Sequence, residues 1–272
     1  MNVQKINIDE ILKHWLSDNN ELIEKNLKTL RISLRQHLEK YLYCVLESTA
    51  LMSADEARSF FWFVHNELLN PTAQSIYGKM IVNVQTQAHE PSANYRKSTD
   101  GFQFHTDGVY KPDSPPLYIV LACIEQADVG GDSFVIDGQT ILTELKANSA
   151  YFEILTSFEF CFKTQWNENG LEYLRRRIIK LNANGSLNRI SFYRAEIEAG
   201  HFIADIPLTD NQIAALNFLE MLFFKHVSDI RFRLQNGDFL IVNNHKMIHG
   251  RMPFKEQIQK RHLLRMWADG LR

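Results

Sequence analysis

The first seventy residues place apolar side chains at steps of three and four positions among charged residues, which is the pattern of amphipathic helices. Within this portion, Ser53 and Glu56 have the spacing of a capping box, in which a hydroxyl and a carboxylate satisfy exposed backbone donors where a helix begins. We therefore predict a helical N-terminal portion over residues 1–70. The apolar positions that define it include Ile11, Trp15, Leu27, Leu30, Leu34, Leu38, Tyr41 and Leu46.

After Pro71 the pattern changes to short apolar runs separated by Gly, Asn, Asp and Pro, which indicates a closed or double-sheet antiparallel body. One helix interrupts these runs near residues 209–227, where Thr209 can cap a segment with one apolar face. No internal repeat, low-complexity tract or flexible linker divides the chain, so we predict a single domain over residues 1–272. The predicted strands cover residues 80–87, 117–125, 133–137, 158–165, 174–181, 190–193, 230–234, 239–243 and 263–267.

Composition narrows the class of protein. The 30 basic and 32 acidic residues nearly cancel, so net charge predicts binding neither to nucleic acid nor to a membrane surface. The chain begins without the basic and apolar regions of a signal peptide and contains no run of eighteen apolar residues, which favours a cytoplasmic location. Cys44, Cys123 and Cys161 occur singly in apolar runs and are predicted to be buried, reduced thiols. A small-molecule substrate is the default expectation.

The stretch FQFHTDGVY, residues 102–110, contains the first candidate for chemistry. His105 and Asp107 are two positions apart, so in an extended chain both side chains point to the same side and can hold one metal ion. Gly108 then permits a turn. Taken alone, the stretch fits a strand that runs into an exposed turn better than a metal site. A third ligand would reverse that preference.

The C-terminal stretch GDFLIVNNHKMIHGRMPF, residues 237–254, offers His245 and His249 as third ligands. Two imidazoles and one carboxylate leave three metal positions open, as in non-haem iron(II) oxygenases, whereas catalytic zinc usually keeps one. Arg261 and Arg265 are four residues apart, so on a strand their guanidinium groups share a face and can bind a buried carboxylate. Alone, the arginine segment fits an exposed C-terminal strand equally well.

Together these motifs resemble the iron(II)- and 2-oxoglutarate-dependent dioxygenases of the taurine dioxygenase (TauD/TfdA) and clavaminate synthase-like family. The resemblance extends from about residue 80 to the end of the chain. It implies an α+β, mostly β fold with a double-stranded β-helix (jelly roll) core over residues 71–272. The motifs, in chain order, are His105-Thr-Asp107, Gly130-Gly-Asp-Ser133, Gly237-Asp, Asn243-Asn, His249-Gly-Arg and Arg261-His-Leu-Leu-Arg265.

The resemblance assigns roles to these residues. It implies that His105, Asp107 and His249 bind iron(II), while His245 does not match the ligand position. It further implies that Ser133 and Arg261 hold the distal carboxylate of the cosubstrate 2-oxoglutarate. The implied reaction consumes O2, releases succinate and CO2, and hydroxylates or desaturates a C–H bond. Because halogenating relatives leave the position of Asp107 small for chloride, halogenation is disfavoured.

Substrate recognition is less defined. The resemblance implies that Arg265 binds an acidic group, so the expected substrate is an amino acid or an amino-acid-derived acid that bears a carboxylate. Gln103, Phe102 and residues 85–96 are further candidates, whereas Arg175 to Arg177 are expected on a solvated sheet face. Two alternatives stay open: a non-catalytic jelly-roll sensor of a metal or small acid, and a zinc-dependent hydrolase. The apolar stripe of the N-terminal helices fits either a homo-oligomer contact or packing against the barrel.

Overall fold

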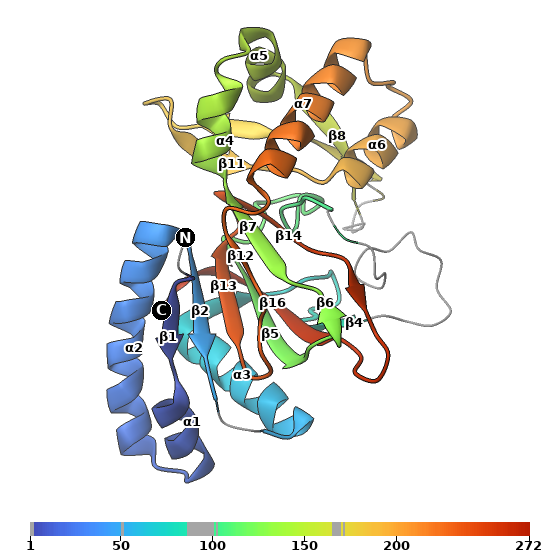
Figure 1. Cartoon of the computed structure of the whole chain (residues 1–272). Helices are drawn as coiled ribbons and strands as arrows, with labels where there is room; N and C mark the ends of the chain where they lie inside the picture. Colours follow the sequence, from blue (N-terminus) through green and yellow to red (C-terminus); the bar gives the residue numbers. More distant parts are fainter. Residues whose placement is uncertain (1–2, 50–51, 86–100, 102, 165–169, 171) are drawn as a thin grey trace.

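A curved seven-stranded sheet forms the centre of the computed structural model (Figure 1). Its neighbouring strands are antiparallel except for the first pair, β1 and β2. The strand order is β1 (Lys5–Asn7), β2 (Tyr43–Glu47), β13 (Phe239–Asn243), β5 (Tyr118–Glu125), β16 (His262–Leu271) and β3 (Leu69–Thr72), with β4 (Val82–Gln85) also paired to β16. The structure describes residues 3–49, 52–85, 101, 103–164, 170 and 172–272.

A second, three-stranded sheet packs against this one and completes the jelly roll. Ile119, Leu240 and Trp267 of the main sheet share one buried core with Val135 and Met247 of the second sheet. The prediction of a mostly β jelly-roll core with helices is thereby confirmed. The second sheet has the order β12 (Arg231–Phe232), β7 (Ser133–Asp137) and β14 (Met247–Arg251), and short pairs join β6 (Val129–Gly130) to β15 (Phe254–Lys255), β8 (Glu159–Lys163) to β9 (Tyr173–Arg177), and β10 (Ile179–Leu181) to β11 (Leu187–Ile190).

The N-terminal helices cover the outer face of the main sheet (Figure 1). They are α1 (Asp9–Leu16), α2 (Asn20–Tyr41) and α3 (Ala54–Leu68), and the predicted capping box of Ser53 and Glu56 opens α3. In β16, Leu264 and Met266 pack on this helical side, whereas Leu263 and Trp267 face the core between the sheets. This two-residue alternation directs Arg265 inward, toward the second sheet.

Two expectations for the elements were wrong. The N-terminal portion is not purely helical, because β1 and the buried β2 join the main sheet; a five-residue apolar strand cannot be told from a buried helix by periodicity alone. The described residues between 71 and 272 include four helices rather than one, gathered at one end of the molecule (Figure 1). These are α4 (Gly138–Leu145), α5 (Ser149–Ser157), α6 (Arg194–Ile203) and the correctly predicted α7 (Asp210–His226), which Thr209 caps.

The arginine run also departs from its expectation. Arg175 and Arg177 are exposed, but Arg176 is buried and donates hydrogen bonds to the backbone carbonyls of Val109, Lys111 and Asp113. It thereby fixes the segment that follows the His-Thr-Asp motif. The three cysteines are buried and form no disulfide, as expected. In the described part of the chain, no helix combines the length and apolar character needed to cross a membrane.

Candidate metal centre

His105, Asp107 and His249 meet at one point between the two sheets. Their potential ligand atoms all lie within 4.8 Å of one another, and the two imidazole centroids are 4.4 Å apart. The backbones of the two histidines are joined directly: each amide donates to the other's carbonyl, at 3.1 and 3.0 Å. Residues 144 positions apart in the chain are thus held in register by the antiparallel bridge itself.

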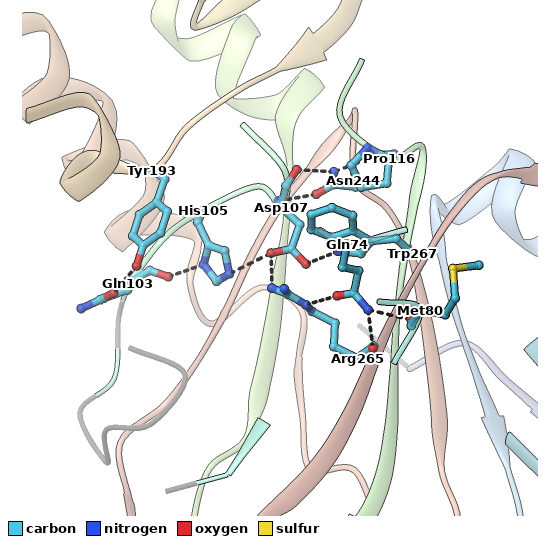
Figure 2. A network of polar contacts seen from close by, with 10 residues as sticks. All are labelled: Gln74, Met80, Gln103, His105, Asp107, Pro116, Tyr193, Asn244, Arg265 and Trp267. Atoms are coloured by element: carbon cyan, nitrogen blue, oxygen red, sulfur yellow. Dashed lines mark hydrogen bonds and ion pairs between the residues drawn. The ribbon is translucent and has the colours of Figure 1, made fainter. Parts of the chain in front are cut away.

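The backbone of Asp107 is fixed by the side chain of Asn244, a buried residue that is 1% exposed. The Asp107 amide donates to Asn244 Oδ1 at 2.8 Å, and Asn244 Nδ2 donates to the carbonyls of Asp107 and Pro116 at 3.0 and 2.9 Å (Figure 2). Gly108 then turns the chain with φ of 70°, and a Cβ atom there would lie 2.6 Å from Pro116 Cδ. The metal motif therefore requires glycine at this turn.

The carboxylate of Asp107 is buried and bound on both oxygens. Arg265 Nη1 donates to Oδ1 at 2.8 Å, and Trp267 Nε1 donates to Oδ2 at 2.9 Å (Figure 2). Burial opposes ionisation of this group, but the positive charge of Arg265 and the hydrogen bond from Trp267 favour the anion, and the pKa of Asp107 is lowered to about 2. Asp107 is therefore an anion near neutral pH, as a metal ligand must be.

The two imidazoles are also in the form that binds metals. His105 Nδ1 donates to the Gln103 carbonyl at 2.9 Å, so in the neutral ring Nε2, 3.9 Å from Asp107 Oδ1, is the nitrogen that can bind a metal (Figure 2). Burial lowers the pKa of His249 to about 3, so its ring is neutral near pH 7. Two imidazoles and one carboxylate suit a divalent first-row metal, and their placement leaves room for further ligands.

A cavity of about 60 Å³ adjoins the three residues. Ser133, Arg251, Arg261 and Arg265 supply its polar wall, and all four are buried. In the pairing of β14 with β7, Arg251 lies opposite Ser133 and His249 lies opposite Val135. The apolar remainder of the wall is formed by Val84, Leu121 and Leu263. The cavity thus offers a metal position at one point and guanidinium groups around it, which suits an anionic chelating ligand.

A family model described as Taurine catabolism dioxygenase TauD, TfdA family matches residues 17–267. The chain belongs to this family. Members of the family use iron(II), 2-oxoglutarate and O2. The three donors and the neighbouring arginines fit that metal and that dianionic cosubstrate, since the metal needs an ionised carboxylate with neutral imidazoles and the cosubstrate needs cationic partners.

Curated relatives include gamma-butyrobetaine dioxygenase from Homo sapiens, which is 31% identical over 196 residues, or 68% of this chain and 48% of the relative. The chain therefore spans about half the length of that relative. It is also 28% identical over 188 residues to 3-((Z)-2-isocyanoethenyl)-1H-indole synthase from Fischerella ambigua, covering 65% of this chain and 67% of the relative.

Solved structures share the fold of this family member at low sequence identity. Asparagine oxygenase, in complex with Fe(II), 2S,3S-3-hydroxyasparagine and succinate, has a TM-score of 0.74 and 16% identity, with 97% of this chain and 93% of the other covered. The non-heme iron oxygenase OrfP, in complex with Fe and alpha-ketoglutaric acid, has a TM-score of 0.69 and 14% identity, with 98% and 94% covered.

The structure brings together most of the residues that the motifs singled out. Ser133, Arg261 and Arg265 line the cavity beside the three candidate ligands. His245 lies outside that group and contacts the Pro115 carbonyl through Nε2. Gln103 does not line the cavity; its carbonyl orients His105, and its side chain accepts a hydrogen bond from the Tyr193 hydroxyl (Figure 2). Phe102 and residues 86–100 lie outside the described residues.

Four residues of the site were not predicted from the sequence. Strand alternation could have predicted Trp267, because it lies two positions from Arg265 and therefore on the same face of the strand. No pattern in the sequence predicts the role of Gln74, which accepts a hydrogen bond from Arg265 Nε and donates one to the Arg265 carbonyl across 191 positions. Asn244 and Arg251 belong to motifs already recognised, but no spacing in the sequence shows what their side chains contact.

Replacing Asn244 by alanine should lower the free energy of unfolding by roughly 1–3 kcal/mol, because the Asp107 amide and two carbonyls lose a buried partner. The affinity for iron(II) should fall as well, since Asp107 is no longer held in place. Chemical denaturation and metal titration measure the two effects. The matched control is Asn188→Ala, at an exposed asparagine of β11; an Asn244 variant that behaves like this control would contradict the positioning role.

Proposed function

We propose that the protein is a non-haem iron(II)- and 2-oxoglutarate-dependent oxygenase that hydroxylates or desaturates an unactivated C–H bond of a small substrate. The observation that carries the proposal is the cluster of His105, Asp107 and His249 at a cavity whose wall also holds Ser133 and Arg261. These three residues are proposed to bind iron(II). When bound, the iron supplies coordination positions for the 2-oxo acid and O2 and carries the electrons of the oxidation.

Ser133 and Arg261 are proposed to hold the distal carboxylate of 2-oxoglutarate. Both are buried in the wall of the cavity. The Gly-Gly-Asp-Ser turn is packed tightly on the arginine: Gly131 has φ of 74°, and a Cβ atom there would lie 3.3 Å from Arg261 Nε. A fixed guanidinium with a neighbouring hydroxyl forms a forked donor set for a carboxylate. The contribution of these residues is to bind and orient the cosubstrate.

The proposed reaction balances with O2 as the oxidant. Loss of CO2 from 2-oxoglutarate supplies two electrons and the substrate C–H bond supplies two more. One oxygen atom enters succinate and, in a hydroxylation, the other enters the product hydroxyl group. In a desaturation the second oxygen atom leaves as water. Asp107 stands at the ligand position that halogenating relatives leave open, so chloride transfer is disfavoured.

The proposed substrate is an amino acid or an amino-acid-derived acid. Structural neighbours of this chain were solved with 3-hydroxyasparagine and with (3S)-hydroxy-L-Arg. Arg265 supports a carboxylate-bearing substrate, because it lines the cavity and its Nη2 has no hydrogen-bond partner among the described residues. Gln103 stays a candidate for substrate contact. Cytoplasmic location, homo-oligomer formation and the absence of nucleic-acid or membrane partners stay predictions.

The test is an assay of the purified protein with iron(II), ascorbate, 2-oxoglutarate and ¹⁸O2 over a panel of amino acids and their N- or side-chain derivatives. At least one substrate should give succinate that contains one ¹⁸O atom, together with a hydroxylated or desaturated product seen by mass spectrometry. Zinc should inhibit this turnover. Zinc-activated hydrolysis, or 2-oxoglutarate binding without turnover of any panel member, would instead favour the hydrolase or the sensor.

A further inference from the structure

Arg251 lies on the same strand and the same face as the candidate ligand His249. The two residues are two positions apart on β14, so both side chains point into the cavity. Two strand residues span roughly 7 Å, close to the distance between the outermost oxygen atoms of an extended five-carbon diacid. A 2-oxo acid bound at the level of His249 and extended along β14 would therefore end at the level of Arg251.

The cross-strand partner of Arg251 is Ser133, which the proposed function assigns to the distal carboxylate. Residues directly opposite in an antiparallel pair have neighbouring side chains on one face, so any carboxylate that reaches the Ser133 hydroxyl also reaches the neighbourhood of Arg251. Ser133 is 3% exposed and Arg251 is 5% exposed. The pairing therefore places a hydroxyl and a guanidinium side by side within the protein interior.

Phe254 links Arg251 to Arg261. The guanidinium carbon of Arg251 lies 4.5 Å from the centre of the Phe254 ring, and that of Arg261 lies 5.6 Å from the same centre. Both guanidinium groups line the cavity, as Ser133 does, so both can act on one anionic group of a ligand there.

We propose that Arg251 is a second guanidinium of the distal carboxylate site and that, with Ser133 and Arg261, it selects dicarboxylic over monocarboxylic 2-oxo acids. The inference rests on the proposed function and adds to it a residue that determines cosubstrate specificity. Arg251 acts through its charge on the distal carboxylate. Its contribution to the affinity therefore requires that carboxylate and does not depend on the 2-oxo acid group that faces the metal.

The test is an anaerobic titration of the iron(II)-loaded protein, followed through the charge-transfer absorption of the iron complex with a 2-oxo acid. Two ligands are compared: 2-oxoglutarate and 2-oxopentanoate, which has the same five carbons without the distal carboxylate. For Arg251→Gln, the Kd of 2-oxoglutarate should rise roughly 10- to 100-fold while that of 2-oxopentanoate changes less than about twofold. Arg251→Lys should recover part of the loss because it retains the charge.

Arg177→Gln, at an exposed arginine of β9, is the matched control and should bind both ligands as the wild type does. An equal weakening of both ligands in Arg251→Gln, or unchanged binding of both, would overturn the assignment of Arg251 alone. A wild-type protein that binds iron(II) but gives no charge-transfer band with 2-oxoglutarate would overturn the proposed function and this assignment with it. Thermal melting of each variant identifies any loss of folding. If Arg251→Gln does not fold, Arg251→Lys is compared with the wild type instead.

Discussion

Replacing Asp107 by alanine should abolish turnover and lower the affinity for iron(II) by more than about 100-fold. Even the loss of a residue that only orients a metal ligand lowers metal affinity roughly 10- to 100-fold, and Asp107 is proposed to be a ligand itself. The same change should destabilise the protein. It leaves the buried guanidinium of Arg265 without its carboxylate, a loss of roughly 3–5 kcal/mol for a broken buried ion pair. Metal titration and denaturation of the metal-free protein measure the two effects separately.

The destabilisation has a defined pH dependence. The pKa of Asp107 falls from 3.8 to about 2 on folding, so its ionised form stabilises the fold above about pH 4. That contribution is lost as pH decreases through the folded pKa, so the difference in stability between the wild type and Asp107→Ala should become smaller there. Asp113→Ala removes an exposed carboxylate from the same segment and is the matched control. If Asp107→Ala retains wild-type iron affinity, Asp107 is not a ligand.

Replacing Arg261 by glutamine should raise the KM for 2-oxoglutarate by at least about 30-fold, which corresponds to roughly 2 kcal/mol or more for truncating a buried charge partner. The value of kcat at saturating cosubstrate should fall much less, because the arginine binds the end of the molecule that does not react. Steady-state kinetics at varied 2-oxoglutarate concentration measure both constants.

The control for this change is Lys260→Gln, which removes the neighbouring exposed charge. It should leave both kinetic constants near their wild-type values, since a solvated cation contributes little to binding inside the cavity. A large fall in kcat with unchanged KM for Arg261→Gln would contradict a role in cosubstrate binding. A hydrolase that uses the same metal ligands would show no dependence on 2-oxoglutarate in either variant.

Part of the candidate metal centre was predictable because His105 and Asp107 form a short-range pattern. The two-residue spacing of His105 and Asp107 already places their side chains on one face of an extended segment. The resemblance to the dioxygenase family, which the order of the downstream motifs supports, singled out His249 over His245 and assigned a role to Arg261. Strand alternation likewise placed Arg265 on the inward face of β16, as found. These features depend on local geometry that a sequence carries directly.

The contacts that hold the centre together were not predictable. Asp107 meets Arg265 and Trp267 across 158 and 160 positions, and Asn244 reaches Asp107 across 137 positions. Such pairings are set by how the two sheets stack, which no local pattern encodes. The buried role of Arg176 was missed for the same reason: alternating exposure in β9 is visible in the sequence, but the carbonyls that receive its hydrogen bonds lie more than sixty positions away.

A crystal structure of the protein grown anaerobically with iron(II) and 2-oxoglutarate tests the central claim most directly, with data collected at the iron absorption edge. The expected result is one anomalous peak bound by His105, Asp107 and His249, and a 2-oxoglutarate molecule whose distal carboxylate contacts Ser133 and Arg261. Iron bound elsewhere, or a 2-oxoglutarate molecule whose distal carboxylate contacts neither residue, would contradict the account.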